Sequence, residues 1–280
     1  MPLWAKTAVI CSLLWLSACS STTFVYNRLH LILPWYVDKY VDLERNQREE
    51  LDQLLVPFLA WHRQQELPIY VDLLDAIEAR LDRPLTPGDV ADVYATMEAA
   101  WFRLEGESLN WLLELGASLS DQQIQSFVEE LQEHQLEWED EYLTRSDQKF
   151  YKESYDNLLD SVQDYLGRLS KPQRNRLREA GDALQRSDHV WLEERAAWLA
   201  RLELMLRRQP GWQQEIREAV ERRDETVSAQ YRSTYEHNLQ VIFSALADVL
   251  NSRTDKQDAR LRRELDDLRD DLETLIAQGS

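Results

Sequence analysis

The chain has 280 residues, with 51 acidic and 32 basic side chains, two cysteines, seven glycines and eight prolines. Average proteins contain about 12% glycine and proline together, so this shortage excludes a turn-rich β-sandwich or barrel. With 44% hydrophobic residues and ten tryptophans, the chain is also too apolar to be disordered throughout. Its formal net charge of −19 argues against a nucleic-acid partner, because contact with phosphates requires an excess of basic side chains.

The first 18 residues are typical of a signal peptide that is removed on export. Lys6 precedes an apolar run over residues 7–16, which is too short to anchor the chain across a bilayer. The run ends in Leu16-Ser17-Ala18-Cys19, which resembles a bacterial lipobox. We therefore expect cleavage before Cys19, acylation of its thiol, with palmitate as the expected chain, and a lipidated tether over residues 19–25. The alternative is an ordinary secretory signal that contains a cysteine by chance.

The residue after Cys19 bears on the membrane to which the protein is sent. In Gram-negative lipoproteins an aspartate at this position often retains the protein in the inner membrane, whereas this chain has Ser20. We therefore expect the outer membrane, with the protein on its periplasmic face. Since Cys11 leaves with the signal peptide and Cys19 is acylated, we expect no disulfide, no cysteine catalysis and no thiolate metal site.

Apolar residues recur at helical spacing along nearly the whole mature chain, interrupted by helix-capping motifs. Two of these motifs, Leu119-Ser120-Asp121-Gln122-Gln123 and Leu169-Ser170-Lys171-Pro172-Gln173, combine a serine N-cap with a glutamine three residues later. Thr86 and Thr254 begin two further helices in a similar way. We predict an all-α fold, a single elongated helical domain over residues 26–280 that forms a bundle of about seven to eight helices. The expected helices span residues 26–40, 44–66, 68–82, 86–115, 120–166, 170–208, 212–250 and 255–277.

Apolar stripes between these caps mark the expected core. The last stripe is a regular heptad seam, formed by Leu261, Leu265, Leu268, Leu272 and Leu275. Another stripe contains Trp101, Leu104, Ser108, Trp111 and Leu115. Aromatic residues at such spacing can line a cofactor site, but they are more typical of a helical core. We expect both stripes to be buried.

Charge is distributed unevenly along the chain. Residues 98–141 contain twelve acidic side chains and one basic side chain, whereas residues 171–223 contain twelve basic and nine acidic ones. One interpretation is a solvated acidic face opposite a mixed face. The other is that the two segments lie side by side, which would reduce repulsion across the bundle while adding little to stability.

The sequence contains no specific catalytic or metal-binding motif. The five histidines are scattered singly, and neither Gly106-Glu107-Ser108 nor Gly116-Ala117-Ser118 has the closing glycine of a nucleophile elbow. Glutamates and one histidine do share a helix face, at Glu130, His134, Glu137 and Glu141. Such a row can hold a divalent ion, but it is also common on acidic solvated helices. We expect no enzyme activity, no cofactor and no metal.

Two segments near the start of the mature chain resemble a known family. They run from Tyr26 through Leu43 and from Trp61 through Tyr70. With the lipobox and the Leu-Ser-x-x-Gln helix starts, they are similar to an uncharacterised bacterial lipoprotein family, domain of unknown function 6279. The resemblance implies lipid attachment and an all-helical fold, and it implies no activity. The helix starts also resemble Leu-Thr-x-x-Gln motifs of periplasmic helical chaperones, although good capping boxes alone would explain them.

The function expected from these features is that of a non-catalytic, outer-membrane lipoprotein, an interaction or chaperone-like protein that contacts client or envelope proteins. A scaffolding lipoprotein of an envelope complex is the alternative, and a metal binder or enzyme is a third hypothesis. A chaperone should expose a contiguous apolar patch on a concave face, larger than the patches of ordinary monomers.

The apolar segment over residues 24–37 follows directly after the expected tether. We expect Trp35 and Tyr36 to be buried at the membrane-proximal end of the bundle, because acidic residues follow immediately. The alternative is that this segment lies in the membrane interface, where tryptophan and tyrosine are enriched.

Overall fold

The computed structural model describes residues 21–279, which are all-α and contain no strand. Residues 21–25, assigned to a tether from the sequence, lie in the first helix. The helices are α2 (Ser21–Tyr26), α3 (Leu29–Val37), α4 (Arg45–Trp61), the π-helix η2 (His62–Glu66), α5 (Leu67–Arg80), α6 (Pro87–Ser118), α7 (Asp121–Leu143), α8 (Asp147–Leu166), α9 (Lys171–Ala183), α10 (Asp188–Met205), α11 (Trp212–Glu221), α12 (Arg223–Thr226), α13 (Ala229–Asn251) and α14 (Asp255–Ala277).

The described part contains more helices than the seven to eight expected, because three predicted helices are interrupted. The helix predicted over 170–208 is divided into α9 and α10. The helix predicted over 120–166 ends at Leu143, and α8 begins behind the N-cap Ser146. The helix predicted over 212–250 is divided into α11, α12 and α13, and Ser228 caps the last of these. Ser146 and Ser228 accept hydrogen bonds from the third backbone amide of their helices, but neither helix has a glutamine at that position. No capping box therefore marked the starts of α8 and α13 in the sequence.

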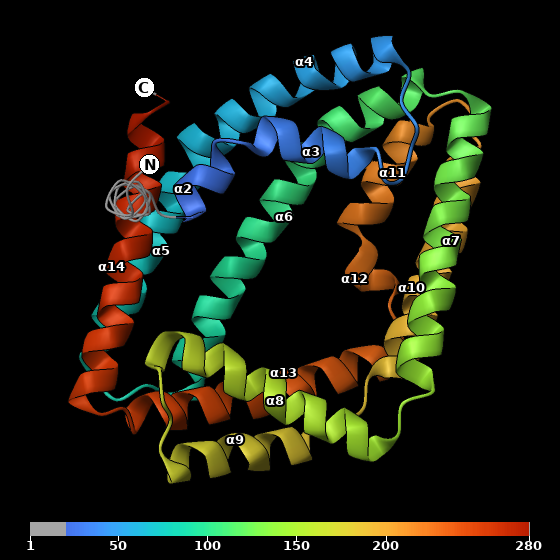
Figure 1. Cartoon of the computed structure of the whole chain (residues 1–280). Helices are drawn as coiled ribbons and strands as arrows, with labels where there is room; N and C mark the ends of the chain where they lie inside the picture. The colour runs from blue at the N-terminus through green and yellow to red at the C-terminus, as the bar shows by residue number, and fades with distance from the viewer. Residues whose placement is uncertain (1–20, 280) are drawn as a thin grey trace, which may run out of the picture.

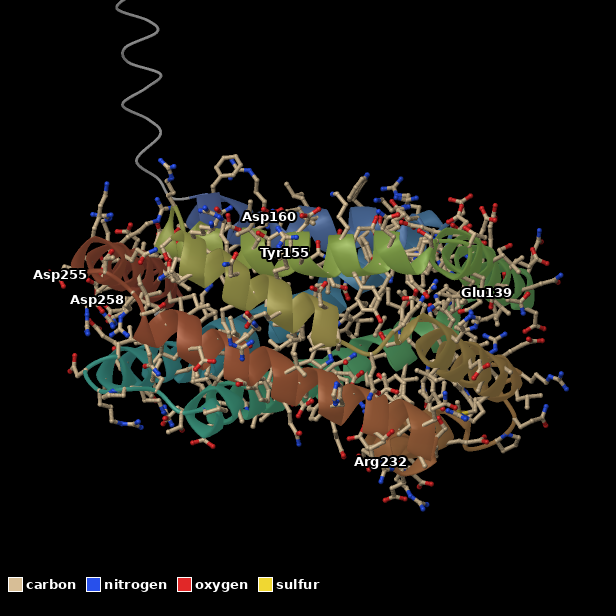
Figure 2. All side chains as sticks on the ribbon, turned by 90° about the horizontal axis from the view of Figure 1, so that it is seen from below. Glu139, Tyr155, Asp160, Arg232, Asp255 and Asp258 are labelled. Atoms are coloured by element: carbon tan, nitrogen blue, oxygen red, sulfur yellow. The ribbon has the colours of Figure 1, made fainter. Side chains whose placement is uncertain are left out.

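The helices form a four-sided frame crossed by α6, rather than an elongated bundle (Figure 1). One side contains α3 and α4, the next α7 and α10, the third α8, α9 and α13, and the fourth α5 and α14. Viewed from below, several helices lie across the depth of the frame, and charged side chains cover its outer surface (Figure 2). The shape follows from the interruptions, because each break lets the chain turn a corner.

One corner of the frame is closed by a pair of glutamines. Gln47 and Gln123 are the third residues of α4 and α7, and each completes the capping box of its own helix. Their side-chain amides hydrogen-bond to each other, with the Gln123 amide donating to the Gln47 oxygen at 2.7 Å. Gln47 also donates to the Ser118 carbonyl at 3.0 Å, and Gln123 to the Asp42 carbonyl at 2.8 Å. Each glutamine thus binds the chain that leads into the other helix.

The diagonally opposite corner repeats this arrangement (Figure 1). Gln173 of α9 and Gln257 of α14 complete capping boxes and hydrogen-bond to each other at 3.1 Å. Gln173 donates to the Ser252 carbonyl at 3.3 Å, and Gln257 to the Arg168 carbonyl at 3.2 Å. In both pairs the carbonyl lies two residues before the N-cap of the partner helix.

Helix packing repeats along with the corners. The contact of α4 with α6 corresponds to that of α9 with α13, and the contact of α7 with α10 corresponds to that of α14 with α5. The half from α4 to α7 and the half from α9 to α14 differ in two connections. A short loop joins α5 to α6, whereas α11 and α12 lie between α10 and α13, and α4 runs through η2 into α5, whereas a loop separates α9 from α10. Figure 1 shows α11 and α12 inside the frame, on the side of α6 that faces α10. The space on the other side of α6 receives no such insertion.

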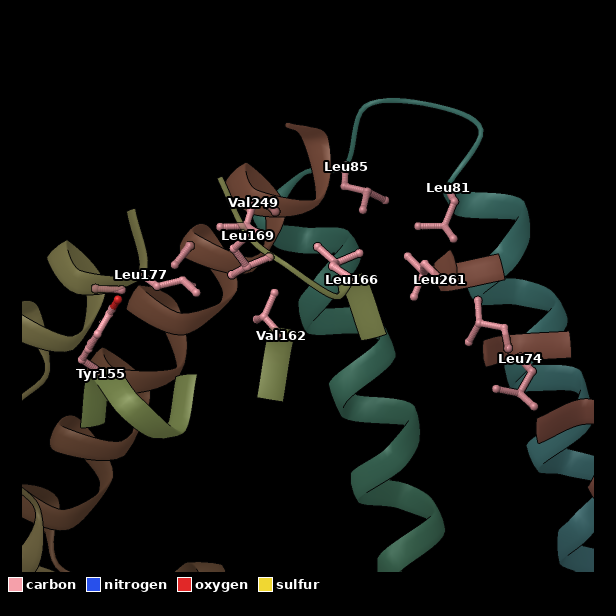
Figure 3. Close-up of a cluster of buried hydrophobic side chains, with 14 of the residues drawn as sticks. Leu74, Leu81, Leu85, Tyr155, Val162, Leu166, Leu169, Leu177, Val249 and Leu261 are labelled. Atoms are coloured by element: carbon pink, nitrogen blue, oxygen red, sulfur yellow. The ribbon is translucent and has the colours of Figure 1, made fainter. Parts of the chain in front are cut away.

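The buried apolar side chains form two clusters. The first lies among α5, α8, α9, α13 and α14, where Leu177 and Leu275 are fully buried (Figure 3). The second lies among α4, α6, α7, α10 and α11, where Leu51 is fully buried. Each cluster lies beside one of the two glutamine pairs. The hydrogen bonds of the glutamines fix how the helices meet, and the clusters supply most of the buried apolar surface.

Candidate binding cavity

An apolar cavity of about 690 Å³ lies between α5, α6, α8, α13 and α14. No residue that lines it carries a charge at neutral pH, and the polar groups are the hydroxyls of Ser161, Tyr70 and Tyr165 and the indole of Trp101. The other lining residues are Leu73, Leu74, Ile77, Met97, Ala100, Leu104, Val162, Leu166, Leu246, Val249, Leu250, Leu261, Leu265, Leu268 and Leu272. Such a lining favours apolar ligands, because their burial gains free energy without requiring directed hydrogen bonds.

The inner walls of the cavity belong to the first hydrophobic cluster. Leu166 is 2% exposed and Val249 is 1% exposed, so this part is rigidly packed from behind. Figure 3 shows Val162 and Leu166 of α8 in the middle of the cluster, with Leu74 and Leu261 on one side of them. The cavity is therefore built into the core, and its walls are fixed by the same contacts that hold the helices together.

The mouth of the cavity is formed by large side chains that remain in contact with solvent. Met97 is 57% exposed, Trp101 is 59% exposed and Tyr165 is 52% exposed. Methionine is flexible enough to fit ligands of different shapes, and aromatic rings offer large apolar surfaces with a polar edge. The prediction that Trp101 is buried in the core is wrong: this side of α6 faces the cavity, where no helix covers the ring.

The leucine seam of α14 both packs in the first cluster and lines the cavity. Leu275 is fully buried in the first cluster, whereas Leu265 and Leu268, on the same face of the helix, line the cavity. Spacings of three and four residues place all of them on one face, as the heptad seam predicts. The sequence located this face, but nothing in it distinguished a leucine packed against a helix from one that borders a cavity.

An ion pair between a buried carboxylate and a partly exposed guanidinium lies next to Tyr70, at the cavity wall. Glu66, the last residue of η2, is 2% exposed and binds the Arg103 guanidinium through two hydrogen bonds of 2.7 and 2.9 Å. This bidentate geometry is the strong form of the interaction. Tyr70, one turn after Glu66, lines the cavity. Burial raises the pKa of the Tyr70 hydroxyl, and the Glu66 carboxylate raises it further, so the hydroxyl keeps its proton at neutral pH.

The π-helix itself is the local feature that the sequence did not reveal. The chain runs from α4 through η2 into α5 without a loop, and the wider π-turn lies at His62–Glu66. Such turns are rare and occur frequently at functional sites. The Tyr26 hydroxyl lies 2.9 Å from Nδ1 of His62 at this turn, which ties α2 to η2. Burial lowers the pKa of His62.

The smaller cavity on the other side of α6 differs in character. It measures about 310 Å³ and is lined partly by charged residues, including Glu105, Glu194 and Arg223. Residues of α11 and α12 form part of its wall. The insertion that separates the two halves of the fold therefore occupies this side, and the apolar cavity remains on the side that lacks it.

The row of acidic residues on α7 does not come together as a metal site. Nδ1 of His134 lies 3.0 Å from the Glu137 carboxylate, and Nε2 lies 3.4 Å from that of Glu130, so carboxylates of the same helix approach both ring nitrogens. Within residues 21–279, no group of three or more histidine, cysteine, aspartate or glutamate side chains is arranged to hold a metal ion. Cys19, the predicted lipidation site, lies outside the described residues.

The acidic and basic segments do lie side by side, as one of the two interpretations of the charge pattern required. The acidic helix α7 packs against α10, and Arg208, just after α10, pairs with Asp121 at the start of α7. Arg223 of α12 pairs with Glu105 of α6 at 2.5 Å. The basic segment thus neutralises part of the acidic surface across the frame.

The segment over residues 24–37 is not buried as expected. Trp35 is 60% exposed and Tyr36 is 51% exposed, while Leu33 and Val37 of the same helix pack against the second cluster. A single short helix can turn only part of its surface towards α4, and this segment has apolar residues on almost every side. Its remaining apolar side chains therefore face outwards.

Comparison with known proteins assigns the family but no activity. The family model described as a family of unknown function, DUF6279, matches residues 39–232. The chain belongs to this family. The match includes the walls that α5, α6 and α8 contribute to the cavity and ends within α13. No curated protein and no solved structure matches the chain.

Among the helices of residues 21–279, none combines the length and the apolar character that crossing a bilayer requires.

Proposed function

We propose that this DUF6279 protein is a non-catalytic, chaperone-like lipoprotein that binds apolar groups of client molecules in the cavity between α5, α6, α8, α13 and α14. The cavity is the observation that carries the proposal. Its volume of about 690 Å³ lies within the range of roughly 300–1,000 Å³ typical of ligand sites. Its concave, uncharged lining is what a chaperone that holds clients by apolar contact needs.

The surroundings of the cavity support binding rather than catalysis. Its hydroxyls belong to Ser161 and the two tyrosines, and no acidic or basic side chain lines it. The flexible side chain of Met97 and the exposed ring of Trp101 at the mouth suit clients of varied shape. The chain also carries a formal net charge of −19, and like charge keeps complexes with apolar clients from associating with one another.

The proposal includes the place where the protein works. The lipobox that ends in Cys19 supports an acyl anchor after removal of a signal peptide over residues 1–18, and Ser20 favours the outer membrane with the domain in the periplasm. There the protein would meet newly exported envelope proteins whose apolar segments are still exposed. These clients are the partners that the cavity chemistry fits.

The proposal is tested by filling the cavity. Ala100 is 8% exposed and lines the cavity, whereas its neighbour Ala99 is exposed on the same helix and lies outside the lining. We expect wild type and Ala99→Phe to slow the aggregation of a chemically denatured client, measured by light scattering, and Ala100→Phe to lose most of this effect. Circular dichroism and thermal unfolding show whether both variants are folded. Equal suppression by the two folded variants would contradict the proposal.

A further inference from the structure

The outward face of α2 and α3 carries a stripe of exposed apolar side chains, and basic side chains lie over two of its aromatic rings. Phe24, Leu31 and Trp35 are 52%, 61% and 60% exposed. Arg28 lies over the Phe24 ring at 3.4 Å from its centroid, and Lys39 lies over the Trp35 ring at 3.9 Å. Leu31 and Trp35 lie one turn apart on the same face of α3, whereas Phe24 belongs to α2 and Arg28 and Lys39 lie just outside the two ends of α3.

We propose that this stripe rests in the interface of a lipid bilayer and fixes the orientation of the frame on the membrane. The stripe is defined as Phe24, Arg28, Leu31, Trp35 and Lys39, with Val25 and Tyr36 beside it, both about half exposed. The inference concerns how the protein lies on the membrane and does not depend on what the cavity binds.

Charge favours a membrane as the partner of this surface. Residues 21–37 include no aspartate or glutamate, although the chain has 51 acidic residues. Asp38, directly before Lys39, is bound by Arg48 at 2.5 Å, and Asp42 lies 3.8 Å from the same guanidinium. Anionic headgroups therefore meet Arg28 and Lys39 where Asp38 is paired with Arg48, although Asp271 also approaches this surface through a 3.3 Å hydrogen bond from Thr23.

The side-chain types are those of an interfacial helix. Tryptophan and tyrosine are enriched at the level of the headgroups, and long basic side chains bury their stems beside apolar groups while the charge reaches the polar region. A helix that presents such a face lies in the plane of the interface rather than across the membrane. In Figure 2 the blue ribbon of the N-terminal helices runs along the upper edge of the frame, with side chains pointing away from it.

The position of the stripe in the chain agrees with this orientation. Helix α2 begins at Ser21, two residues after Cys19. Two extended residues span at most about 7 Å, so an acyl chain on Cys19 would hold the start of α2 directly at the bilayer surface. The stripe would then be the part of the domain nearest to the lipid.

The test uses the full-length protein reconstituted into vesicles of phosphatidylethanolamine and phosphatidylglycerol that carry brominated acyl chains, which quench tryptophan emission on contact. We compare Trp35→Phe with the matched control Trp101→Phe, because the two indoles are almost equally exposed. We expect Trp35→Phe to lose most of the quenching seen in wild type. Quenching that persists in Trp35→Phe would overturn the inference. If it instead disappears in Trp101→Phe, lipid chains enter the cavity, and the inference fails while apolar binding in the cavity stands.

A second pair of variants keeps Trp35 and disturbs the stripe. Leu31→Glu places a negative charge in it, and Leu136→Glu places the same charge on α7, at a leucine that is 65% exposed. Because both sites are open to solvent, neither change disturbs the core. We expect Leu31→Glu to lower the lipid quenching at least twofold and Leu136→Glu to leave it unchanged. The same quenching in both variants would contradict an interfacial stripe.

Discussion

The corner formed by Gln173 and Gln257 offers a sharp test of how the frame is held together. Gln173 is 2% exposed, and its side chain makes four hydrogen bonds. Its amide donates to the Ser252 carbonyl and to the Gln257 oxygen, and its oxygen accepts from the Ser170 backbone amide and from the Gln257 amide. Gln173→Ala removes all four at once and leaves their partners in a site from which water is largely excluded.

The expected cost follows from the partners left behind. A buried polar group without a partner costs about 1–3 kcal/mol, and an ordinary hydrogen bond contributes about 0.5–1.5 kcal/mol. Gln257 keeps its bond to Arg168, so only part of that side chain is left unsatisfied. We therefore expect Gln173→Ala to lower the free energy of unfolding by about 3 kcal/mol, a loss that corresponds to two or three unsatisfied groups.

The opposite corner supplies an internal comparison. Gln123 makes the same set of contacts but is partly open to solvent, so water can replace some of them. We expect Gln123→Ala to cost about half as much, near 1.5 kcal/mol. Gln125→Ala is the control, because this exposed side chain bonds only within its own helix, to Glu129, and its loss should cost less than about 0.5 kcal/mol.

The assay is equilibrium unfolding in urea, followed by circular dichroism and by tryptophan fluorescence. Agreement between the two signals indicates a two-state transition, for which the free energies can be compared. A double variant, Gln173→Ala with Gln257→Ala, should cost clearly less than the sum of the single changes, because the two side chains share one network. If Gln173→Ala proves as mild as Gln125→Ala, the paired glutamines do not hold the corner, and our reasoning about the frame is wrong.

Three further predictions concern the anchor, a histidine and a buried ion pair. Cys19→Ala should abolish acylation, seen as the loss of the lipid mass by mass spectrometry, and an unchanged mass shift would contradict the lipobox. Burial lowers the pKa of His62 in the folded protein. Just below the usual histidine pKa of about 6.5, the unfolded state therefore binds more protons than the folded state. The free energy of unfolding should fall as the pH drops through that value. His62→Gln should show a smaller fall in urea titrations at pH 7 and pH 5.5, and identical pH dependence would refute this. Asp188, whose side chain is 6% exposed, binds Arg145 and Arg186, so Asp188→Asn should cost about 3 kcal/mol at pH 7 in the same assay; a loss below 1 kcal/mol would show that the pair is dispensable.

The sequence was informative wherever a local motif decides the structure. The capping boxes at Ser120, Ser170 and Thr254 are N-caps in the structure, with hydrogen bonds from the third backbone amides of their helices. Their glutamines proved to have a second role, since each also binds the opposite helix. That role depends on which helices meet at a corner, and the residue spacing within a single motif cannot predict which helices these are.

Helix breaks that have no capping box could not be predicted from the sequence. Ser146 and Ser228 look like ordinary exposed serines within continuous helical patterns, and only the backbone shows that helices begin after them. The breaks matter because they turn a bundle into a frame. Once the long helix predicted over 120–166 is divided, α8 can run along a different side from α7.

The cavity could not be predicted from the sequence for a related reason. Leu265 and Leu268 have the same spacing whether they face another helix or an open space. What leaves the space open is the short connection from α5 to α6, compared with the inserted helices α11 and α12 in the other half. The exposed stripe on α2 and α3 was visible as an apolar segment, but its direction depended on how much of α3 contacts α4.

The most direct test of the account is whether the cavity binds an apolar molecule. Purified full-length protein is titrated with an apolar dye whose emission rises on leaving water, and the affinity and stoichiometry are measured for wild type, Ala100→Phe and Ala99→Phe. The account predicts one strong site per chain in wild type and in Ala99→Phe, and an affinity at least tenfold weaker in Ala100→Phe. Equal affinity in all three folded proteins would show that the dye binds elsewhere and that the cavity is not the binding site.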